Sequence, residues 1–548
     1  MKSLAYFGKK LVHLCKFSCT KVSNFYISCK ILIKSYFHIL LFEVNPVWIQ
    51  LSYFSTISLF GYLALKLSQP RTITPNSTSA SPFTPNNIDI LFTSISAATV
   101  SSMATVEMEF FSNTQLIFMT ILMLMGGEVF TSLFRLNLKT FFHRNELITN
   151  TNTKELVSFS GSVGVEENEK PKENDLESNT NYYLRNFSVR SDGLNYDSVI
   201  KSLGYVVLVY FLVVQMVGVI LVASYTSLVS SAREVLTKKG ISIQTFSIFV
   251  TVSTFSNTGF VPTNENMIVF KKNSGLLLLL IPQTLLGNTL FAPSLRFLIW
   301  VLEKLTKRED YRYMLKNSKE MGYGHLISSV KCQFLAMTVL GFIVIQFVLL
   351  CAMEWNSQVM DGLSWFEKLV AAFFQVVNTR HSGEAVFDLS IVSSAILVLF
   401  VAMMYLPQYF SFMPIKPEEE VTKSGKGHKN EGRTAMQCIL FSQLSYLVIF
   451  IVLICILERE KMKTDPLNFN VLSITLEVIS AYGNVGYSTG YSCARQIKAE
   501  ASCKDRWYGF VGRWSNLPKF VLIIVMLFGR LKKFTSHGGK AWRVSKYS

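Results

Sequence analysis

Phe255-Ser256-Asn257-Thr258-Gly259-Phe260 is a small, hydroxyl-rich turn that ends a short apolar stretch, 241–256. Three further turns end the apolar stretches 89–101, 365–378 and 471–481; they read Thr99-Val100-Ser101-Ser102-Met103, Arg380-His381-Ser382-Gly383-Glu384 and Tyr482-Gly483-Asn484-Val485-Gly486-Tyr487. A helix needs about 20 apolar residues to cross a bilayer, so these stretches are too short to span one. Short helices are tolerated at membrane depth when they are buried in protein or line a water-filled cavity. We therefore predict re-entrant helices at these places.

Longer apolar segments flank the short ones. They are 46–67, 115–138, 202–228, 274–301, 326–353, 389–413, 436–457 and 517–531. The order of span, short helix, turn and span recurs in repeats 45–138, 201–301, 326–413 and 436–534. Internal repetition of this kind sets the architecture. It predicts an all-α polytopic membrane protein, with eight transmembrane helices and four re-entrant pore helices around one central pore.

The composition agrees with a membrane protein. The chain has 548 residues, of which 50% are hydrophobic and 16% charged, with a net charge of +17. Globular domains are usually about 25% charged. These values exclude a soluble enzyme-like domain, a collagen-like chain, a disulfide scaffold and a wholly disordered chain. We expect no nucleic-acid partner, because a nucleic-acid binder with this net charge would carry more charge on a polar surface.

The positive charge predicts the orientation in the membrane. Residues 1–44 hold many lysines and one acid, Glu43, and the tail 535–548 holds basic residues and no acid. Cytoplasmic loops carry the excess of Lys and Arg, so we expect both termini, the linker 139–200 and the loops 302–325 and 414–435 in the cytoplasm. Segment 16–42 is either an interfacial helix or a basic topogenic tail. Within the linker, 145–192 has the polar composition of a disordered segment. This topology also places the sequon at Asn76 outside, which is consistent with it but is no independent proof.

The turns have the chemistry of an ion filter. Aligned on the short helices, their fourth positions are Ser102, Gly259, Gly383 and Gly486, flanked by Val100, Ser101, Asn257, Thr258, His381, Ser382, Asn484 and Val485. Backbone carbonyls replace the water shell of a cation when they point at one axis, in conformations that Gly reaches without strain. The negative ends of the helix dipoles also favour cations. A single Gly is explained equally well as a helix cap, but four in register favour a selectivity filter.

Long strings around these turns resemble the pore regions of plant HKT cation transporters. The strings are 99–109, 111–116, 253–267, 378–384, 483–493 and 507–515, and the resemblance extends from about residue 49 to residue 534. It implies the Trk/Ktr/HKT arrangement of membrane–pore–membrane units, and a homodimer. In that family, Ser at the first filter position marks the sodium-selective subfamily, so the resemblance assigns Ser102 a preference for Na+ over K+.

Four other groups of residues have two interpretations each. Tyr405 and Pro407 form either an intracellular constriction or a plain helix kink. Lys519 and Arg530 either face the permeation path or snorkel from span ends, which we favour. Cys493 and Cys503 form either a disulfide or two free thiols. Acids that follow the turns either gather cations at the outer mouth or are solvated or ion-paired: Glu107, Glu109, Glu265, Glu384 and Asp388.

The predicted function is passive Na+ transport across the plasma membrane through a Ser-Gly-Gly-Gly filter. The alternatives are Na+–K+ symport or K+ transport by the same fold and, as a weaker one, a membrane-embedded enzyme. The chain has no phosphate-binding loop and no pair of histidines at helical spacing. We therefore expect no cofactor, no catalytic residue and no fixed structural metal. The expected partners are monovalent cations and the lipid bilayer, besides the second copy that the resemblance implies.

Overall fold

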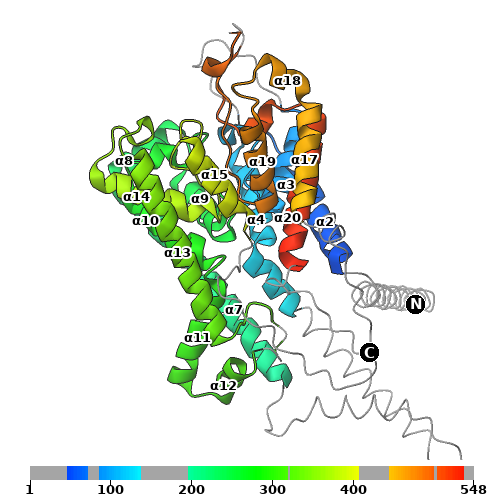
Figure 1. Ribbon diagram of the computed structural model, residues 1–548. Coiled ribbons are helices and arrows are strands. Elements are labelled where there is room, and N and C mark those ends of the chain that lie inside the picture. Colours follow the sequence, from blue (N-terminus) through cyan, green and yellow to red (C-terminus); the bar gives the residue numbers. More distant parts are fainter. Residues whose placement is uncertain are drawn as a thin grey trace, which may run out of the picture.

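The computed structural model describes residues 46–71, 85–137, 196–318, 321, 323–406, 443–498 and 503–535 (Figure 1). Regular structure within these ranges is entirely helical, as predicted. Several predicted features lie outside the described residues: the segment 1–44, Asn76, the linker segment 145–192, Pro407, the loop 414–435 and the tail from 536.

The helices follow the predicted order in four repeats. The first holds α2 (Pro46–Leu67), α3 (Asn87–Ala98) and α4 (Asn113–Gly126) with its continuation Glu128–Asn137. The second holds α7 (Tyr196–Leu228), α9 (Ile243–Ser256), α10 (Ser274–Leu286) and α11 (Phe291–Thr306). The third holds α13 (Ser329–Glu354), α14 (Trp365–Thr379) and α15 (Ser394–Tyr405). The fourth holds α17 (Gln443–Leu457), α19 (Val471–Gly483) and α20 (Asn516–Thr535).

Shorter elements lie between these helices. They are α8 (Ser230–Lys238), α12 (Glu309–Lys316), α18 (Arg459–Thr464) and the 3-10 turns Met108–Phe110, Asn266–Phe270, Gln358–Met360, Cys493–Arg495 and Phe510–Arg513.

The pore helices α3, α9, α14 and α19 begin and end within three residues of the predicted stretches. Their starts have a local cause. Ser364 and Glu367 form a capping box at α14, and Ser242 and Asn470 cap α9 and α19 through their side chains. Such caps satisfy amide groups that the first helical turn leaves without partners.

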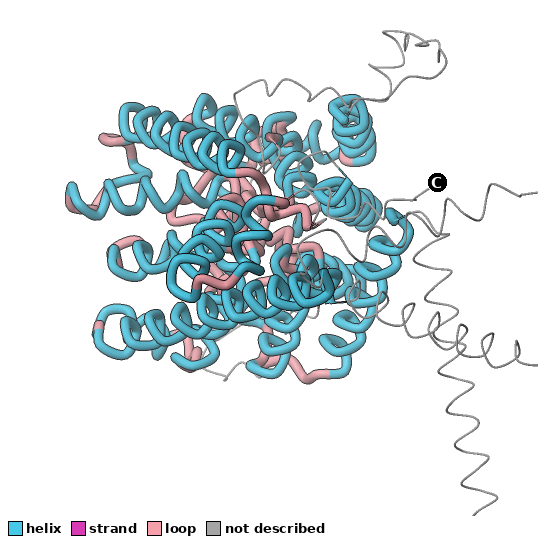
Figure 2. Tube along the Cα trace, turned by 90° about the horizontal axis from the view of Figure 1, so that it is seen from below, coloured by secondary structure: helices cyan, strands magenta, loops and turns pink. Residues whose placement is uncertain are grey.

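The repeats close into a ring. The second long helix of each repeat packs on the pore helix of the next: α4 on α9, α10 on α14, α15 on α19, and α20 back on α3. Figure 2 shows the result from one end of the molecule, with helices surrounding a central group of loops. The ring places the four filter turns at its centre.

Two described helices are long and apolar enough to cross a membrane alone, 198–228 within α7 and 329–354, which is α13. The count becomes four if each bent pair forms one span: Asn113–Gly126 with Glu128–Asn137 at 62°, and α10 with α11 at 83°. The other predicted spans fall short of this test over their described residues. The described parts of α15 and α17 have only 12 and 15 residues, and α20 carries Lys519, Arg530, Lys532 and Lys533.

Apolar side chains cover the outer faces of the long helices. On α7 these include Val209, Leu212 and Met216, and on α13 they include Met337 and Leu340, all at least half exposed. A soluble protein would bury such surface, whereas lipid solvates it.

Candidate functional site

The backbone of the four turns has a repeated conformation. The predicted filter positions Ser102, Gly259, Gly383 and Gly486 have φ angles of +54°, +81°, +69° and +100°. This left-handed region costs a residue with a Cβ about 1–2 kcal/mol, and glycine almost nothing. Ser102 is thus the one residue of the four for which this backbone conformation is unfavourable.

Each glycine contacts the backbone of the next turn. A Cβ built on Gly259 would lie 1.6 Å from the carbonyl oxygen of Ser382, and one on Gly383 would lie 2.1 Å from that of Val485. A Cβ on Gly486 would meet Ser102 at 2.2 Å and the carbonyl oxygen of Ser101 at 2.8 Å. In every case the contact is the residue at, or just before, the neighbouring filter position. These close approaches require glycine and link the second turn to the third, the third to the fourth and the fourth to the first.

Local hydrogen bonds shape the turns. The amides of Ser101, Thr258 and Val485 each donate to a carbonyl oxygen five residues earlier, at 2.8–3.0 Å. In the third turn the amide of Gly383 itself makes this bond, to Asn378 at 3.0 Å. Bonds of this type close helix C-termini. Counted from this bond, the filter position of the third turn therefore comes one residue sooner than in the other turns. The alignment of the four turns by sequence did not predict this difference.

The residue two positions before the filter position also differs between the third turn and the other three. Val100, Asn257 and Asn484 are left-handed, with φ between +49° and +57°, while the third turn has His381 there. Its Nδ1 lies 2.7 Å from the carbonyl oxygen of Val377 and its Nε2 lies 2.7 Å from the hydroxyl of Thr289. His381 thus ties the third turn to the segment between α10 and α11.

The other flanking side chains stabilise the turns by hydrogen bonds or by burial. The Nδ2 of Asn484 donates to the hydroxyl of Ser101 at 2.8 Å, joining the fourth turn to the first. Ser382 donates to the side-chain oxygen of Asn378. Thr258 and Val485 are buried.

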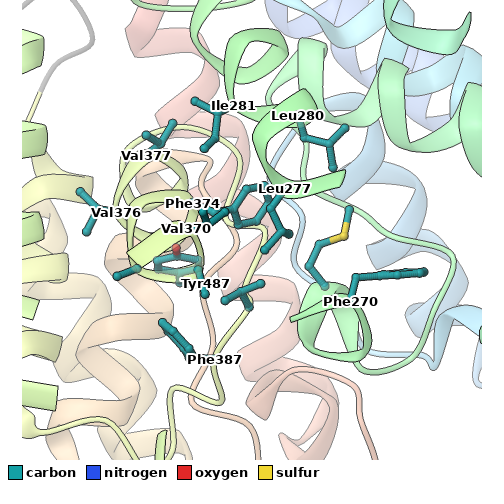
Figure 3. Close-up of a cluster of buried hydrophobic side chains, with 14 of the residues drawn as sticks. Phe270, Leu277, Leu280, Ile281, Val370, Phe374, Val376, Val377, Phe387 and Tyr487 are labelled. Atoms are coloured by element: carbon teal, nitrogen blue, oxygen red, sulfur yellow. The ribbon is translucent and has the colours of Figure 1, made fainter. Parts of the chain in front are cut away.

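A buried apolar cluster supports the third and fourth turns (Figure 3). Tyr487, next to Gly486, lies among Phe374 of α14, Leu277 of α10 and Phe387 of the segment between α14 and α15. Its hydroxyl donates to the carbonyl oxygen of Gln375 at 2.7 Å. Side chains from three repeats thus hold the backbone after the filter glycine.

Three predicted mouth acids are ion-paired. Glu109 and Glu265 each lie 2.5 Å from the Nζ of Lys239, and Glu107 lies 3.1 Å from Arg506. Burial alone would lower the pKa of Lys239, but its bonds to Glu109 and Glu265 outweigh burial and raise that pKa. The two ion-pair groups clamp the first repeat to the second and to the fourth.

The other two acids have different places. Asp388 is exposed and accepts the amide of Ser390 at 2.9 Å. Glu384 is fully buried behind the third turn and accepts the hydroxyl of Thr254 at 2.5 Å. Glu477 of α19, which the sequence analysis missed, is also fully buried and accepts the hydroxyl of Ser488.

Lys519 and Arg530 of α20 are both buried, so the favoured snorkelling interpretation is wrong. Lys519 pairs with Asp89, in the first turn of α3, at 2.8 Å. Arg530 is 1% exposed, donates to the carbonyl oxygen of Gly126 and lies 5.6 Å from the ring centroid of Phe54. Packing against α3 and α4 holds both charges inside the protein because those helices supply their partners.

Tyr405, the predicted constriction residue, ends α15. Its ring stacks on that of Tyr482 of α19, with the two ring centroids 6.2 Å apart. Cys493 and Cys503 form a disulfide, with their Cα atoms 5.9 Å apart, in the loop after the fourth turn.

Three further glycines, missed by the sequence analysis, fix the distance between the long helices and the pore helices. Cβ atoms on Gly126, Gly287 and Gly529 would lie 2.1, 1.8 and 2.0 Å from the carbonyl oxygens of Ala98, Phe255 and Tyr482. Each of those oxygens is four residues before a filter position. The signal was available, because each glycine ends or interrupts a predicted span at the same place.

Known proteins resemble this chain over most of its length. Residues 179–414 and 432–537 match the family TrkH, described as cation transport protein. The Arabidopsis thaliana protein named sodium transporter HKT1 is 50% identical over 483 residues, or 87% of this chain and 91% of that protein. Cation transporter HKT1;3 of Oryza sativa subsp. japonica is 47% identical over 541 residues, 98% of each chain. The structure of the potassium transporter TrkH from Vibrio parahaemolyticus aligns with 14% identity and a TM-score of 0.47, over 90% of this chain and 83% of that one.

Proposed function

Because the chain belongs to the TrkH family of cation transport proteins, in its HKT branch, we propose that it conducts Na+ passively through the four central turns. It is a membrane transporter rather than an enzyme. Ser102, Gly259, Gly383 and Gly486 form the selectivity filter in this proposal, and the flanking residues hold their backbone in place.

The observation that carries the proposal is the series of close contacts that links the four turns, from Gly259 to Ser382, from Gly383 to Val485 and from Gly486 to Ser102. Successive carbonyls directed at an axis replace the hydration shell of a monovalent cation. Four pore helices end at these turns, and their C-terminal dipoles favour positive charge there. A membrane potential of about 100 mV supplies about 2.3 kcal/mol per charge, which drives transport without a coupled reaction.

Ser102 supports Na+ as the preferred ion. It breaks the fourfold equivalence of the filter, because its side chain fills the space beside Gly486. A Cβ and a hydroxyl at one of the four positions restrict the backbone and intrude on the pore, which disturbs a cage of carbonyls matched to K+. The proteins named sodium transporter HKT1 and cation transporter HKT1;3 are relatives over nearly the whole chain.

We place the protein in the plasma membrane with both termini in the cytoplasm. The basic loop 302–325 then faces the cytoplasm, and the disulfide Cys493–Cys503 faces the outside, where disulfides persist. In this proposal Tyr405 narrows the path on the cytoplasmic side, and Arg530 faces that path. Two copies of the chain form a homodimer, each copy with its own pore.

Voltage clamp of cells that express the full chain tests the ion. The reversal potential should follow external Na+ and remain unchanged when external K+ is varied. Ser102→Gly should admit K+. A wild-type reversal potential that follows both ions equally favours K+ transport or Na+–K+ symport and rejects the sodium assignment.

A further inference from the structure

The helix α11 has one packed face and one exposed face. Leu295 and Ile299 are buried against the rest of the protein. Phe297, Trp300 and Lys304 are exposed and follow one another at spacings of three and four residues, which places side chains on one face of a helix. At 3.6 residues per turn, this exposed face lies on the opposite side of α11 from the two buried residues. The protein therefore leaves an aromatic and basic surface of α11 uncovered.

The aromatic part of this surface lies where the neighbouring span begins. The Nη1 of Arg296 donates to the carbonyl oxygen of Ile327 at 2.9 Å, and the span α13 begins two residues after that oxygen, at Ser329. From Arg296, α11 extends by about 15 Å more at its rise of about 1.5 Å per residue. Figure 1 shows α11 and α12 at the end of the molecule opposite α18. Phe297 and Trp300 thus lie at the boundary of the apolar layer, and the end of α11 lies beyond it.

Phe297 and Trp300 form a single exposed aromatic surface. Their ring centroids are 5.9 Å apart and their planes are inclined by 29°. The two residues are 64% and 47% exposed. Tryptophan is enriched at the level of the lipid headgroups, because its ring has both an apolar body and a polar N–H. The pair therefore indicates where lipid headgroups meet acyl chains along α11.

Three basic residues follow the aromatic pair. Lys304, Lys307 and Arg308 are exposed, and none of them forms an ion pair with another described residue. The acid on the same stretch of helix, Glu303, lies 3.4 Å from Arg312 of α12. The next two acids stand in the first turn of α12, where the helix dipole favours negative charge. The exposed face of α11 thus ends in positive charge that the protein itself does not neutralise.

The position of α11 matters for the filter. Thr289 lies in the short segment between α10 and α11, and its hydroxyl is 2.7 Å from the Nε2 of His381 in the third turn. Helix α11 begins two residues later, at Phe291. A displacement of α11 would therefore pull on a hydrogen bond that holds a filter turn.

We propose that the exposed face of α11 binds an anionic phospholipid of the cytoplasmic leaflet. Its headgroup contacts Lys304, Lys307 and Arg308, and its acyl chains contact the rings of Phe297 and Trp300. Each basic residue near a membrane surface contributes about a fivefold preference for anionic lipid. The bound lipid holds α11 in place and so supports the third turn. The choice of leaflet and the effect on transport rest on the proposed function.

Quenching of tryptophan fluorescence measures the site. The full chain is reconstituted into phosphatidylcholine vesicles that contain either brominated phosphatidylserine or the same amount of brominated phosphatidylcholine. The signal of Trp300 is the fluorescence lost in Trp300→Phe, which keeps an aromatic ring. Brominated phosphatidylserine should quench this signal more strongly. Combining Lys304→Gln, Lys307→Gln and Arg308→Gln should reduce the preference for phosphatidylserine about tenfold or more. Free phosphate has no brominated chain and gives no quenching.

A matched control removes three exposed positive charges elsewhere. Arg459→Gln and Lys463→Gln on α18, with Lys498→Gln in the disulfide loop, should leave the preference of Trp300 unchanged. A second measurement needs no change at the basic residues. Raising the ionic strength with choline chloride should weaken the preference of the wild-type chain, because exposed charges are screened by salt.

The outcomes separate the site, its effect and the proposed function. Equal quenching of Trp300 by the two lipids overturns the site, and so does a preference that survives the removal of the three basic residues of α11. Na+ uptake into the same vesicles tests the effect on the filter, and it should be faster with phosphatidylserine in the wild-type chain only. Uptake by the wild-type chain that is the same with both lipids overturns that effect. Absence of Na+ uptake from every vesicle overturns the proposed function, whereas the quenching does not depend on transport.

Discussion

Ser102 and Gly486 share one space at the boundary between the first and fourth turns: a Cβ on Gly486 would lie 2.2 Å from the Cβ of Ser102. Real Cβ atoms do not approach so closely, so a side chain at position 102 requires glycine at position 486. The residue proposed to select the ion and a filter glycine from the other end of the chain are therefore one structural unit.

This relationship predicts a rescue. Gly486→Ala should abolish the Na+ current, because the new methyl group clashes with Ser102 and forces the turn apart. Ser102→Gly in the same chain removes the main obstacle, so the double variant should regain part of the current. Recovery stays partial, since the carbonyl oxygen of Ser101 remains 2.8 Å from the new Cβ and φ is +100°. Voltage clamp with surface labelling measures both effects.

Gly259→Ala is the control for that rescue. Its Cβ would lie 1.6 Å from the carbonyl oxygen of Ser382, a contact that Ser102 does not touch. Ser102→Gly should therefore restore nothing to Gly259→Ala. Equal behaviour of the two alanine variants in both backgrounds contradicts the pairing of Ser102 with Gly486.

The buried ion pair between Lys519 and Asp89 predicts a large loss of stability. Both side chains are 6% exposed, and their charged atoms are 2.8 Å apart. Lys519→Met leaves the carboxylate buried without its partner, which costs about 3–5 kcal/mol. The double variant Lys519→Met with Asp89→Asn should be more stable than Lys519→Met alone, because no charge is stranded. Thermal unfolding of the purified protein measures the difference.

An exposed pair on α8 provides the comparison. Lys238 and Glu234 are 2.8 Å apart, but their side chains are 74% and 64% exposed. Lys238→Met should leave the melting temperature unchanged, because solvent screens such pairs. A loss in Lys238→Met as large as in Lys519→Met would show that burial is not the cause.

The ion-pair clamp around Lys239 predicts a specific pH dependence. Its pKa is raised above the ordinary value of 10.5, so the folded protein binds this proton more tightly than the unfolded chain does. The stabilisation is therefore fully present below pH 10.5 and is lost as the pH rises through the raised value. The difference in stability between wild type and Lys239→Met should be constant from neutral to mildly alkaline pH and shrink at higher pH. A difference that already disappears near neutral pH would contradict the clamp.

The disulfide Cys493–Cys503 closes a loop with a sequence separation of 10 residues. Removing it with Cys493→Ser should cost about 2–3 kcal/mol, the entropy of a loop of this length. The same variant should expose the thiol of Cys503 to a membrane-impermeant maleimide added outside the cell. Labelling of the wild-type cysteines at the same rate contradicts the bond.

The sequence predicted what depends on local composition and repetition. The four pore helices lie close to their expected positions because apolar length and hydroxyl-rich turns are local signals. It could not predict the partners of Lys519 and Arg530, because Asp89 and Gly126 lie more than 400 residues away in the chain. Nor could it reveal the different hydrogen bonding of the third turn, in which the amide of Gly383 itself, and not that of the residue before it, closes the helix end.

The glycines that face the pore helices predict a sharp contrast between two similar substitutions. Gly529 and Gly341 both lie inside long helices, α20 and α13. A Cβ on Gly529 would lie 2.0 Å from the carbonyl oxygen of Tyr482, whereas one on Gly341 would meet nothing within 4 Å. Gly529→Ala should push α20 away from α19 and reduce Na+ current and surface expression together. Gly341→Ala should keep the current and stabilise the protein by up to about 1 kcal/mol, since alanine favours helix over glycine. If Gly529→Ala conducts like wild type, the close packing of α20 on the fourth pore helix is not required for transport.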